Sequence, residues 1–317
     1  MIVVGGEALV DLVPDRAATA PTAGLRPVPG GGPFNTAVAL GRLGAPVAFL
    51  GRLSTDAFGE VLLRRLRAAH VDVNLVRRGA EPTTLAVVSL DSDGSARYAF
   101  YVDGTADRLL TDPGPLPDEV TIVSLGTLGM VLEPAASAYE KVLRRESRRG
   151  RLIVLDPNIR AGLIHDPAAY RARFASWLPD VGLVKASEED AGWLASGWSA
   201  WLDAGAGAVV LTRGPAGLSA FTRHGRVDVP AAPAEVADTI GAGDTVHAAL
   251  IAWLHGHEVA SRADLDELDA PAWRAALRHA AAAAAITVSR PGAEPPYAAE
   301  LDAVSGVPSV PEREADQ

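Results

Sequence analysis

The chain has 317 residues, of which 48% are hydrophobic, so it can bury a large core in one large or two ordinary domains. Its formal net charge of -10 argues against nucleic acid as the main partner, because binding to a phosphate backbone requires clustered cations. It contains no cysteine, which excludes disulfides, thiolate zinc sites and a cysteine nucleophile.

The first segment, MIVVGGEALV, lacks the basic region and cleavage site of a signal peptide and is predicted as a strand. The longest apolar run, Ala280–Val288, is much shorter than the ~20 residues needed to span a bilayer. We therefore expect a soluble cytoplasmic protein with no membrane partner. One local basic run is predicted to be a solvated helix face; its members are Arg144, Arg145, Arg148, Arg149 and Arg151.

Short β-rich runs alternate with helical stretches along most of the chain, and several runs are continuously apolar, as in strands buried on both faces of a parallel sheet. The predicted strands are Ile2–Val4, Val47–Leu50, Val120–Leu125, Leu152–Leu155, Gly182–Lys185 and Ala208–Leu211. The predicted helices include Thr36–Leu43, Phe58–Ala69, Pro134–Arg149 and Pro167–Trp177. This alternation predicts an α/β domain with right-handed crossovers.

One segment departs from the alternation. Thr84–Leu90 and Ser95–Val102 flank an Asp-Ser-Asp-Gly turn and indicate a β-hairpin. With the segment around residues 11–30 it is expected to form a small sheet apart from the main core, and both a mobile lid and an ordinary edge hairpin fit the pattern. The residues 305–317 are rich in Pro and Glu and are predicted to be a flexible tail after a single domain of residues 1–304.

Polar residues follow the predicted strands at their carboxyl ends, which is where open parallel sheets bind ligands. The segments concerned are Gly126-Thr127, Asp156–Arg160, Ser187–Asp190 and Thr212–Gly214. We therefore expect a ligand site along this edge of the sheet.

The clearest local motif is Asp238-Thr239-Ile240-Gly241-Ala242-Gly243-Asp244. A helix beginning near Gly243 is predicted from the apolar stripe that follows at helical spacing: Val246, Ala249, Leu250, Trp253 and Leu254. Small residues at a helix start let an anion approach the backbone N–H groups, and Asp244 in the first turn can accept a proton from an attacking hydroxyl. The alternative is that Asp244 is only a favourable first-turn acid beside a tight glycine loop.

Two other phosphate-binding loops are excluded. A Walker A loop requires Gly-Lys, and neither Lys141 nor Lys185 follows a glycine. A dinucleotide fingerprint requires a third glycine three residues after Gly243, where this chain has Val246.

A second glycine-rich block is Gly30-Gly31-Gly32-Pro33-Phe34-Asn35. The glycines permit close backbone approach, and the Asn35 amide suits a polyhydroxylated ligand or, alternatively, a helix N-cap. Asp11 can accept two hydroxyl hydrogen bonds or be an ordinary turn residue. No Ser-His-Asp arrangement and no metal-spaced histidine pair is present, and the surface or packing histidines are predicted to be His70, His247, His255 and His257.

These two blocks resemble the signatures of the ribokinase-like (PfkB) carbohydrate kinase family, over roughly Ile2 to Pro296. The N-terminal signature covers Gly30–Gly44 and continues through Gly51–Gly59, and Asp238–Asp244 resembles the C-terminal one. The resemblance implies a doubly wound, mostly parallel α/β sheet with a small β lid over residues 11–30 and 83–108. It also implies MgATP as the donor and a homodimer formed through the lid.

By the same resemblance, Asp244 matches the catalytic base, with Gly241, Ala242 and Gly243 as the anion hole. The implied sugar contacts are Asp11, Gly31, Gly32, Asn35, Phe100 and Arg160. The implied nucleotide contacts are Lys185, Ser187, Asp190, Thr212, Gly214, Gly217 and, in the adenine-packing stretch His279–Ala283, Ala280 and Ala283.

The fructokinase-like branch fits best, on Glu7–Asp11, Phe100–Asp107, Asp156–Arg160 and Ser289–Ala293, and implies conversion of fructose to fructose 6-phosphate. Kinases of 2-keto-3-deoxygluconate, of other ketoses or of nucleosides remain alternatives, with Tyr98, Phe100 and Tyr101 available to stack on a base. A non-catalytic sugar-binding regulatory protein is a further alternative, against which the complete Asp244 loop argues.

One departure concerns magnesium. The family's Asn-x-x-Glu motif, which organises Mg²⁺ and its waters, appears here as Ser187-Glu188-Glu189-Asp190, so a water-mediated Mg²⁺ contact is expected from Asp190. Asp238 is present where many members bind a monovalent cation, which makes K⁺ activation a hypothesis.

Overall fold

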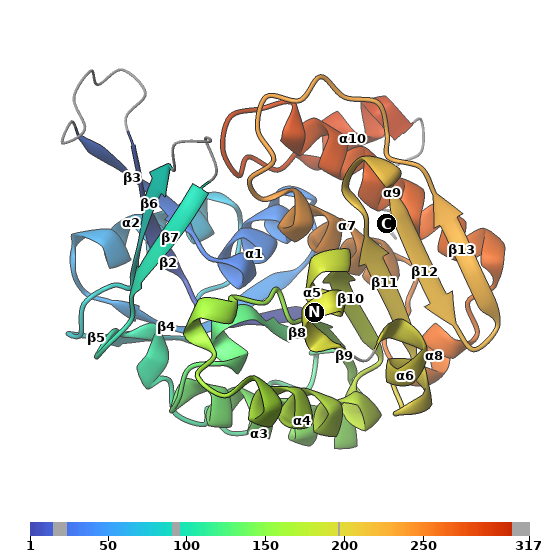
Figure 1. Cartoon of the computed structure of the whole chain (residues 1–317), viewed down its shortest axis with the longest axis horizontal. Helices are drawn as coiled ribbons and strands as arrows, with labels where there is room; N and C mark the ends of the chain where they lie inside the picture. The colour runs from blue at the N-terminus through green and yellow to red at the C-terminus, as the bar shows by residue number, and fades with distance from the viewer. Residues whose placement is uncertain (15–23, 91–95, 196, 306–317) are drawn as a thin grey trace, which may run out of the picture.

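A nine-stranded sheet forms the centre of the molecule, and a separate four-stranded sheet stands at one side of it (Figure 1). The computed structural model describes residues 1–14, 24–90, 96–195 and 197–305. The large sheet has the order β13-β12-β11-β10-β9-β8-β1-β4-β5. Its strands are β1 (Ile2–Gly5), β4 (Val47–Ser54), β5 (Val76–Gly79), β8 (Ile122–Gly126), β9 (Leu152–Asp156), β10 (Leu183–Ser187), β11 (Ala208–Thr212), β12 (Leu218–Thr222) and β13 (Gly225–Val229).

The strands from β11 to β5 pair in parallel, and β12 and β13 extend the sheet in antiparallel fashion. All six predicted strands are present, and the predicted fold class is confirmed. Every residue of β1 and β9 is buried, which agrees with their continuously apolar sequences. The parallel strands therefore bring their carboxyl ends to one edge, as the site prediction requires.

Helices cover both faces of the large sheet (Figure 1). One face packs against α1 (Gly32–Arg42), α2 (Ala57–Ala68), α7 (Ala242–Gly256) and α9 (Ala270–Val288), with α10 (Ala298–Ser305) on α9 and the short α8 (Arg262–Asp266) nearby. The other face packs against α3 (Ala135–Arg148), α4 (Pro167–Trp177), α5 (Glu188–Leu194) and α6 (Gly197–Asp203). Short 3-10 helices lie between these elements: η1 (Asp107–Leu109), η2 (Thr127–Met130), η3 (Ala161–Leu163), η4 (Leu178–Asp180) and η5 (Gly214–Ala216).

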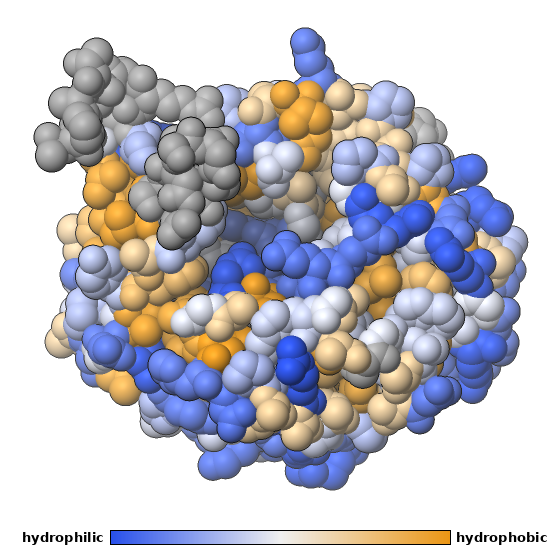
Figure 2. Space-filling model, in the orientation of Figure 1, coloured by the Kyte–Doolittle hydropathy of each residue, from blue (hydrophilic) through white to orange (hydrophobic). Residues whose placement is uncertain are grey.

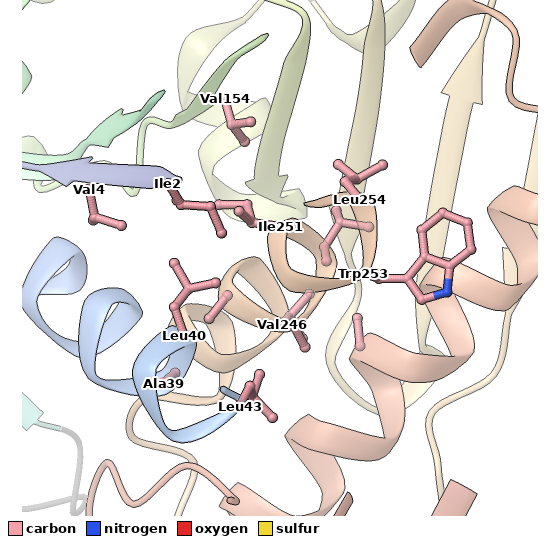
Figure 3. Close-up of a cluster of buried hydrophobic side chains, with 14 of the residues drawn as sticks. Ile2, Val4, Ala39, Leu40, Leu43, Val154, Val246, Ile251, Trp253 and Leu254 are labelled. Atoms are coloured by element: carbon pink, nitrogen blue, oxygen red, sulfur yellow. The ribbon is translucent and has the colours of Figure 1, made fainter. Parts of the chain in front are cut away.

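Alternate residues of β1 belong to the two hydrophobic cores, which lie on opposite faces of the large sheet. Ile2 and Val4 join the cluster that includes α1 and α7, whereas Val3 joins the cluster on the opposite face. Figure 3 shows Leu40 of α1 and Ile251 of α7 meeting beneath β1. This packing fixes α1 and α7, the two helices that begin at the predicted glycine-rich blocks, beside each other.

Helix α1 starts at Gly32, four positions before the predicted start. Pro33 is tolerated because a backbone N–H in the first turn of a helix would have no hydrogen-bond partner within the helix. Gly31, the residue before the helix, has a φ of 106°. Asn35 consequently lies inside the helix, and its backbone N–H donates to the Gly31 carbonyl. The N-cap alternative for Asn35 is therefore wrong, which leaves its side chain available for the site.

The smaller sheet, called the lid sheet below, consists of β2 (Leu9–Pro14), β3 (Leu25–Gly30), β6 (Leu85–Leu90) and β7 (Ala96–Tyr101), in the order β3-β2-β6-β7. The predicted hairpin is present as the antiparallel pair β6–β7, and its turn lies outside the described residues. Residues 15–23 of the predicted lid and 306–317 of the predicted tail also lie outside them. In the ranges that the structure describes, no helix combines the length and apolar character required to cross a membrane.

The predicted solvated face of α3 is only partly correct. Arg148 is exposed, but Arg145 and Arg149 flank Glu146, which has no exposed surface and pairs with both at 3.4 and 2.8 Å. The arginines are thus used in an ion-pair cluster that a periodicity argument does not detect.

Candidate active site

A cleft of about 330 Å³ lies between the lid sheet and the carboxyl ends of the large sheet's strands. Figure 2 shows hydrophilic residues lining a hollow beside the lid sheet. The cleft brings together most of the predicted sugar and catalytic residues with one predicted nucleotide contact, Lys185. The sugar and catalytic residues are Asp11, Gly31, Gly32, Asn35, Phe100, Arg160, Gly241, Gly243 and Asp244. Residues far apart in the sequence therefore form one site.

Asp244 lies in the first turn of α7 and faces this cleft. The Asn35 side-chain amide donates to its Oδ2 at 2.9 Å. Burial raises the pKa of Asp244 to about 6, against the lowering influence of the Asn35 hydrogen bond and the nearby Lys185 charge. A carboxylate with a raised pKa, held at the cleft by an amide, is suited to act as a general base.

The loop before Asp244 requires its glycines. Gly241 has a φ of 76°, and a Cβ added there lies 2.6 Å from the Cβ of Ala293. A Cβ added at Gly243 lies 3.3 Å from the Lys185 Nζ. Ala242 is not among the cleft-lining residues, and its N–H donates to the Thr239 carbonyl at 3.3 Å, so the predicted three-amide anion hole is not complete in this structure.

Lys185 and Asp156 form a buried ion pair at the ends of the adjacent strands β10 and β9, with Nζ 2.8 Å from Oδ2. Their side chains are only 5% and 10% exposed. Although burial acts to lower it, the pKa of Lys185 is raised above its ordinary value by Asp156, Asp244 and Asp190. The ammonium therefore stays charged beside the first turn of α7.

Asp11 and Arg160 lie on either side of the cleft. Burial raises the pKa of Asp11 to about 6; the Arg160 charge acts in the opposite direction and Asp244 in the same direction. Arg160 is exposed, and its guanidinium donates to Asn158 Oδ1 at 2.7 Å. Lid-sheet residues Tyr98 and Phe100 also line the cleft, with ring centroids 6.0 Å apart and nearly parallel.

The Ser187–Asp190 segment forms the N-terminus of α5. Ser187 Oγ accepts from the Asp190 N–H, and the Asp190 carboxylate accepts from the Ser187 N–H at 3.0 Å, which is a capping box. Asp190 Oδ1 also accepts from the Ile159 N–H at 2.7 Å and so anchors the segment that carries Arg160. The predicted magnesium residue thus has a structural function at this helix start.

The other predicted nucleotide and metal residues lie outside the lining of the cleft. Thr212, Gly214 and Gly217 are at the β11–β12 connection, where Gly217 has a φ of 90°. Ala280 and Ala283 have no exposed surface and belong to the hydrophobic core, so a direct nucleotide contact at these two is wrong for this structure. Asp238 accepts from the Ile240 and Gly292 N–H groups and joins the α7 loop to the C-terminal segment.

No group of three or more metal-binding side chains is found within residues 1–14, 24–90, 96–195 and 197–305. Mg²⁺ does not require one, because it usually keeps several waters and uses one or two carboxylates together with substrate phosphates. Asp190 Oδ1 accepts one hydrogen bond and retains a lone pair, so the residues present fit a water-mediated contact.

Sequence reasoning assigned no role to three cleft residues. Thr127 and Asn158 have φ values of 50° and 37°, and both follow strand ends; positive φ at a non-glycine residue is a conformation that concentrates at functional sites. Glu7 also lines the cleft and is buried. Thr127 and Asn158 belong to the polar segments that follow predicted strands, and Glu7 to the segment Glu7–Asp11 that resembles the fructokinase-like branch, but no signal gave them an individual role.

The chain is similar to several proteins that are called fructokinase. The "Fructokinase" of Rhizobium leguminosarum bv. trifolii is 40% identical over 282 residues, covering 86% of both chains, and that of Klebsiella pneumoniae is 34% identical over 306 residues, covering 93% and 96%. The crystal structure of fructokinase with bound ATP from Xylella fastidiosa superposes with a TM-score of 0.86 at 26% identity, covering 96% of this chain and 99% of that one. Fructokinase from Vibrio cholerae O395, in its fructose-, ADP- and calcium-bound form, gives a TM-score of 0.82 at 25% identity, covering 95% and 97%.

The model of the pfkB family carbohydrate kinases matches residues 1–300, which is nearly the whole described chain. This result confirms the family predicted from the two glycine-rich signatures. The chain belongs to the pfkB family of carbohydrate kinases.

Proposed function

We propose that this protein is an ATP-dependent fructokinase that transfers the γ-phosphoryl group of MgATP to fructose and forms fructose 6-phosphate. The observation that carries the proposal is the position of Asp244, buried at the cleft at the start of α7 and hydrogen-bonded to Asn35. The relatives called fructokinase, including one at 40% identity, support the choice of fructose.

In the proposed mechanism, Asp11, the Gly31–Gly32 backbone and Asn35 orient the sugar in the cleft. Asp244 accepts the proton of the attacking hydroxyl, whose oxygen bonds to the γ-phosphorus as the bond to ADP breaks. Lys185 and Arg160 are the lysine and arginine that line the described cleft, and their positive charges oppose the charge on the phosphoryl oxygens.

Asp190 would hold Mg²⁺ through water at Oδ1, and the metal would offset phosphate charge when bound.

The proposed function includes activation of the enzyme by K⁺ bound in the region of Asp238. Exchanging KCl for tetramethylammonium chloride tests it, and equal rates in the two salts would remove K⁺ from the account.

A homodimer formed through the lid sheet and a cytoplasmic location are also proposed. The lid sheet exposes Leu25, Tyr98 and Tyr101 by 48%, 48% and 63%, an amount of apolar surface consistent with a partner. Sedimentation equilibrium of the wild type and of Tyr101→Lys tests the dimer, which the variant should weaken.

A nucleoside kinase is the second candidate, because the Tyr98–Phe100 pair lines the cleft and aromatic rings stack on bases. The experiment is ADP release from MgATP with fructose, 2-keto-3-deoxygluconate, ribose, tagatose and a nucleoside. The Asp244→Asn protein is the blank. Fructose should give the highest kcat/KM, whereas a preference for the nucleoside would replace fructokinase with the second candidate. Sugar binding without any ADP release would instead support a non-catalytic regulatory protein.

A further inference from the structure

Glu7 lies where the chain passes from the large sheet to the lid sheet. Strand β1 ends at Gly5 and strand β2 begins at Leu9, so the crossing consists of residues 6–8. The Glu7 side chain turns inward: the residue is only 3% exposed, yet it lines the cleft that holds Asp11 and Asp244.

The Glu7 carboxylate joins two backbone segments that are far apart in the sequence. Its Oε1 accepts from the Gly32 N–H at 3.3 Å, and its Oε2 accepts from the Gly129 N–H at 3.0 Å. The Thr127 hydroxyl also donates to it. One carboxylate therefore connects the start of α1 with the η2 turn.

No cation pairs with Glu7 among the ion pairs of the described residues. Burial raises the pKa of Glu7 to about 7; the titratable groups that face it are Asp107 of η1 and Tyr139 of α3, and Asp107 raises that pKa further. A buried acid without a cation is costly, and replacing it by an apolar side chain of similar size would serve packing alone at least as well. Packing alone therefore does not explain an acidic residue at position 7, whereas the hydrogen bonds of its carboxylate beside the cleft do.

The segment that Glu7 holds carries proposed sugar contacts. Gly31 has a φ of 106°, and a Cβ added there lies 2.9 Å from the Glu7 carbonyl oxygen. A Cβ added at Gly32 lies 3.0 Å from Thr127 and 3.1 Å from the Asn158 Nδ2. The Gly31–Gly32 segment is therefore packed closely against Glu7, Thr127 and Asn158. A shift of this segment alters the sugar subsite directly.

We propose that Glu7 is a positioning residue for the sugar subsite: its carboxylate holds the Gly31–Gly32 segment against the η2 turn and thereby sets sugar affinity. The proposal rests on the proposed function for the identity of the ligand, but the hydrogen bonds that it invokes exist in the free protein. A glutamine at position 7 has one acceptor oxygen, so it can serve only one of the two glycine N–H groups and places an N–H₂ against the other.

The test compares Glu7→Gln with Glu146→Gln, which removes the charge of another buried glutamate that does not line the cleft. Glu7→Gln should raise the KM for fructose about tenfold, as expected for one unsatisfied buried donor, while the KM for ATP and kcat stay within about twofold. Glu146→Gln should lower the melting temperature and leave the KM for fructose unchanged. An unchanged KM in Glu7→Gln, or an equal rise in both variants, overturns the proposal.

Amide hydrogen exchange in the ligand-free proteins separates this proposal from the proposed function. Glu7→Gln should accelerate exchange in peptides that contain Gly32 and Gly129, and Glu146→Gln should not. If the wild type phosphorylates no fructose, the fructokinase proposal fails. The exchange data alone then show whether Glu7 holds the Gly32 and Gly129 N–H groups. Unchanged exchange in both peptides then overturns the inference.

Discussion

The Asn35 side-chain amide donates a hydrogen bond of 2.9 Å to Oδ2 of Asp244, which lies 209 positions further along the chain. The bond joins the first turns of α1 and α7, whose apolar residues pack together beneath β1 (Figure 3). The amide that is proposed to bind the sugar thus also orients the proposed base, so sugar recognition and proton transfer share one contact.

Replacing Asn35 should therefore affect both functions. In Asn35→Leu, the pKa of Asp244 should rise, because Asn35 lowers it, and the KM for fructose should increase about tenfold with the loss of a hydrogen bond to a charged group. Steady-state kinetics across pH measure both effects. Asn74→Leu, at an exposed asparagine, is the control, and kinetics equal to that control would separate Asn35 from the site.

Activity should depend on pH through Asp244 and Asp11, two of the carboxylates that line the cleft. The pKa values of Asp244 and Asp11 are both about 6, so kcat/KM should rise with pH through about 6 as they ionise and level off above that. In Asp11→Asn the acidic limb should become shallower, because one fewer carboxylate ionises. A pH profile that is flat from 5 to 8 contradicts ionisation of Asp244 as a requirement for turnover.

The buried pair of Lys185 and Asp156 should matter for both catalysis and stability. Lys185→Met should lower kcat ~10²-fold or more, as for loss of a charge-stabilising donor. The substitution should also shift the acidic limb of the pH profile to higher pH, because Lys185 lowers the pKa of Asp244. It should cost about 3–5 kcal/mol of stability, because Asp156 is left unpaired.

The double variant Lys185→Met with Asp156→Leu should recover most of that stability, since an apolar pair can replace a buried ion pair. Its activity should remain low. Urea unfolding and ADP release on the three proteins give the comparison, and recovery of turnover in the double variant would assign the pair a purely structural role.

These predictions depend on side-chain relationships, which the sequence showed only in part. The signatures predicted the cleft residues because each glycine-rich block leads directly into a helix whose apolar stripe fixes its position. They did not predict the local turn bond from the Ala242 N–H to Thr239. They also did not predict the burial of Ala280 and Ala283, since it depends on how α9 packs into the core. The contact of Asp190 with Ile159 was also missed, because Ile159 is distant in sequence. The capping box is local, but the Ser-x-x-Asp spacing was interpreted as a magnesium motif.

The charge of Asp244 should reduce the stability of the folded protein. Its pKa of about 6 is above the ordinary 3.8, so the folded state is stabilised while Asp244 is protonated, and this contribution is lost as pH rises through about 6. At 1.36 kcal/mol for each pH unit, the loss is about 3 kcal/mol. Asn cannot ionise, so Asp244→Asn should be more stable than the wild type by about that amount at pH 8 and by little at pH 4. Urea unfolding at both pH values measures it, and an Asn variant less stable at pH 8 would contradict the burial of a charged carboxylate.

Turnover measured together with sugar binding decides whether Asp244 is the base that activates fructose. Fructose-dependent ADP release and calorimetric fructose binding are measured on the wild type and Asp244→Asn under the same conditions. The variant should lose ~10²–10⁴-fold in kcat and still bind fructose within a few-fold of the wild-type affinity. Near-native turnover by Asp244→Asn would contradict the claim and remove Asp244 from the base role.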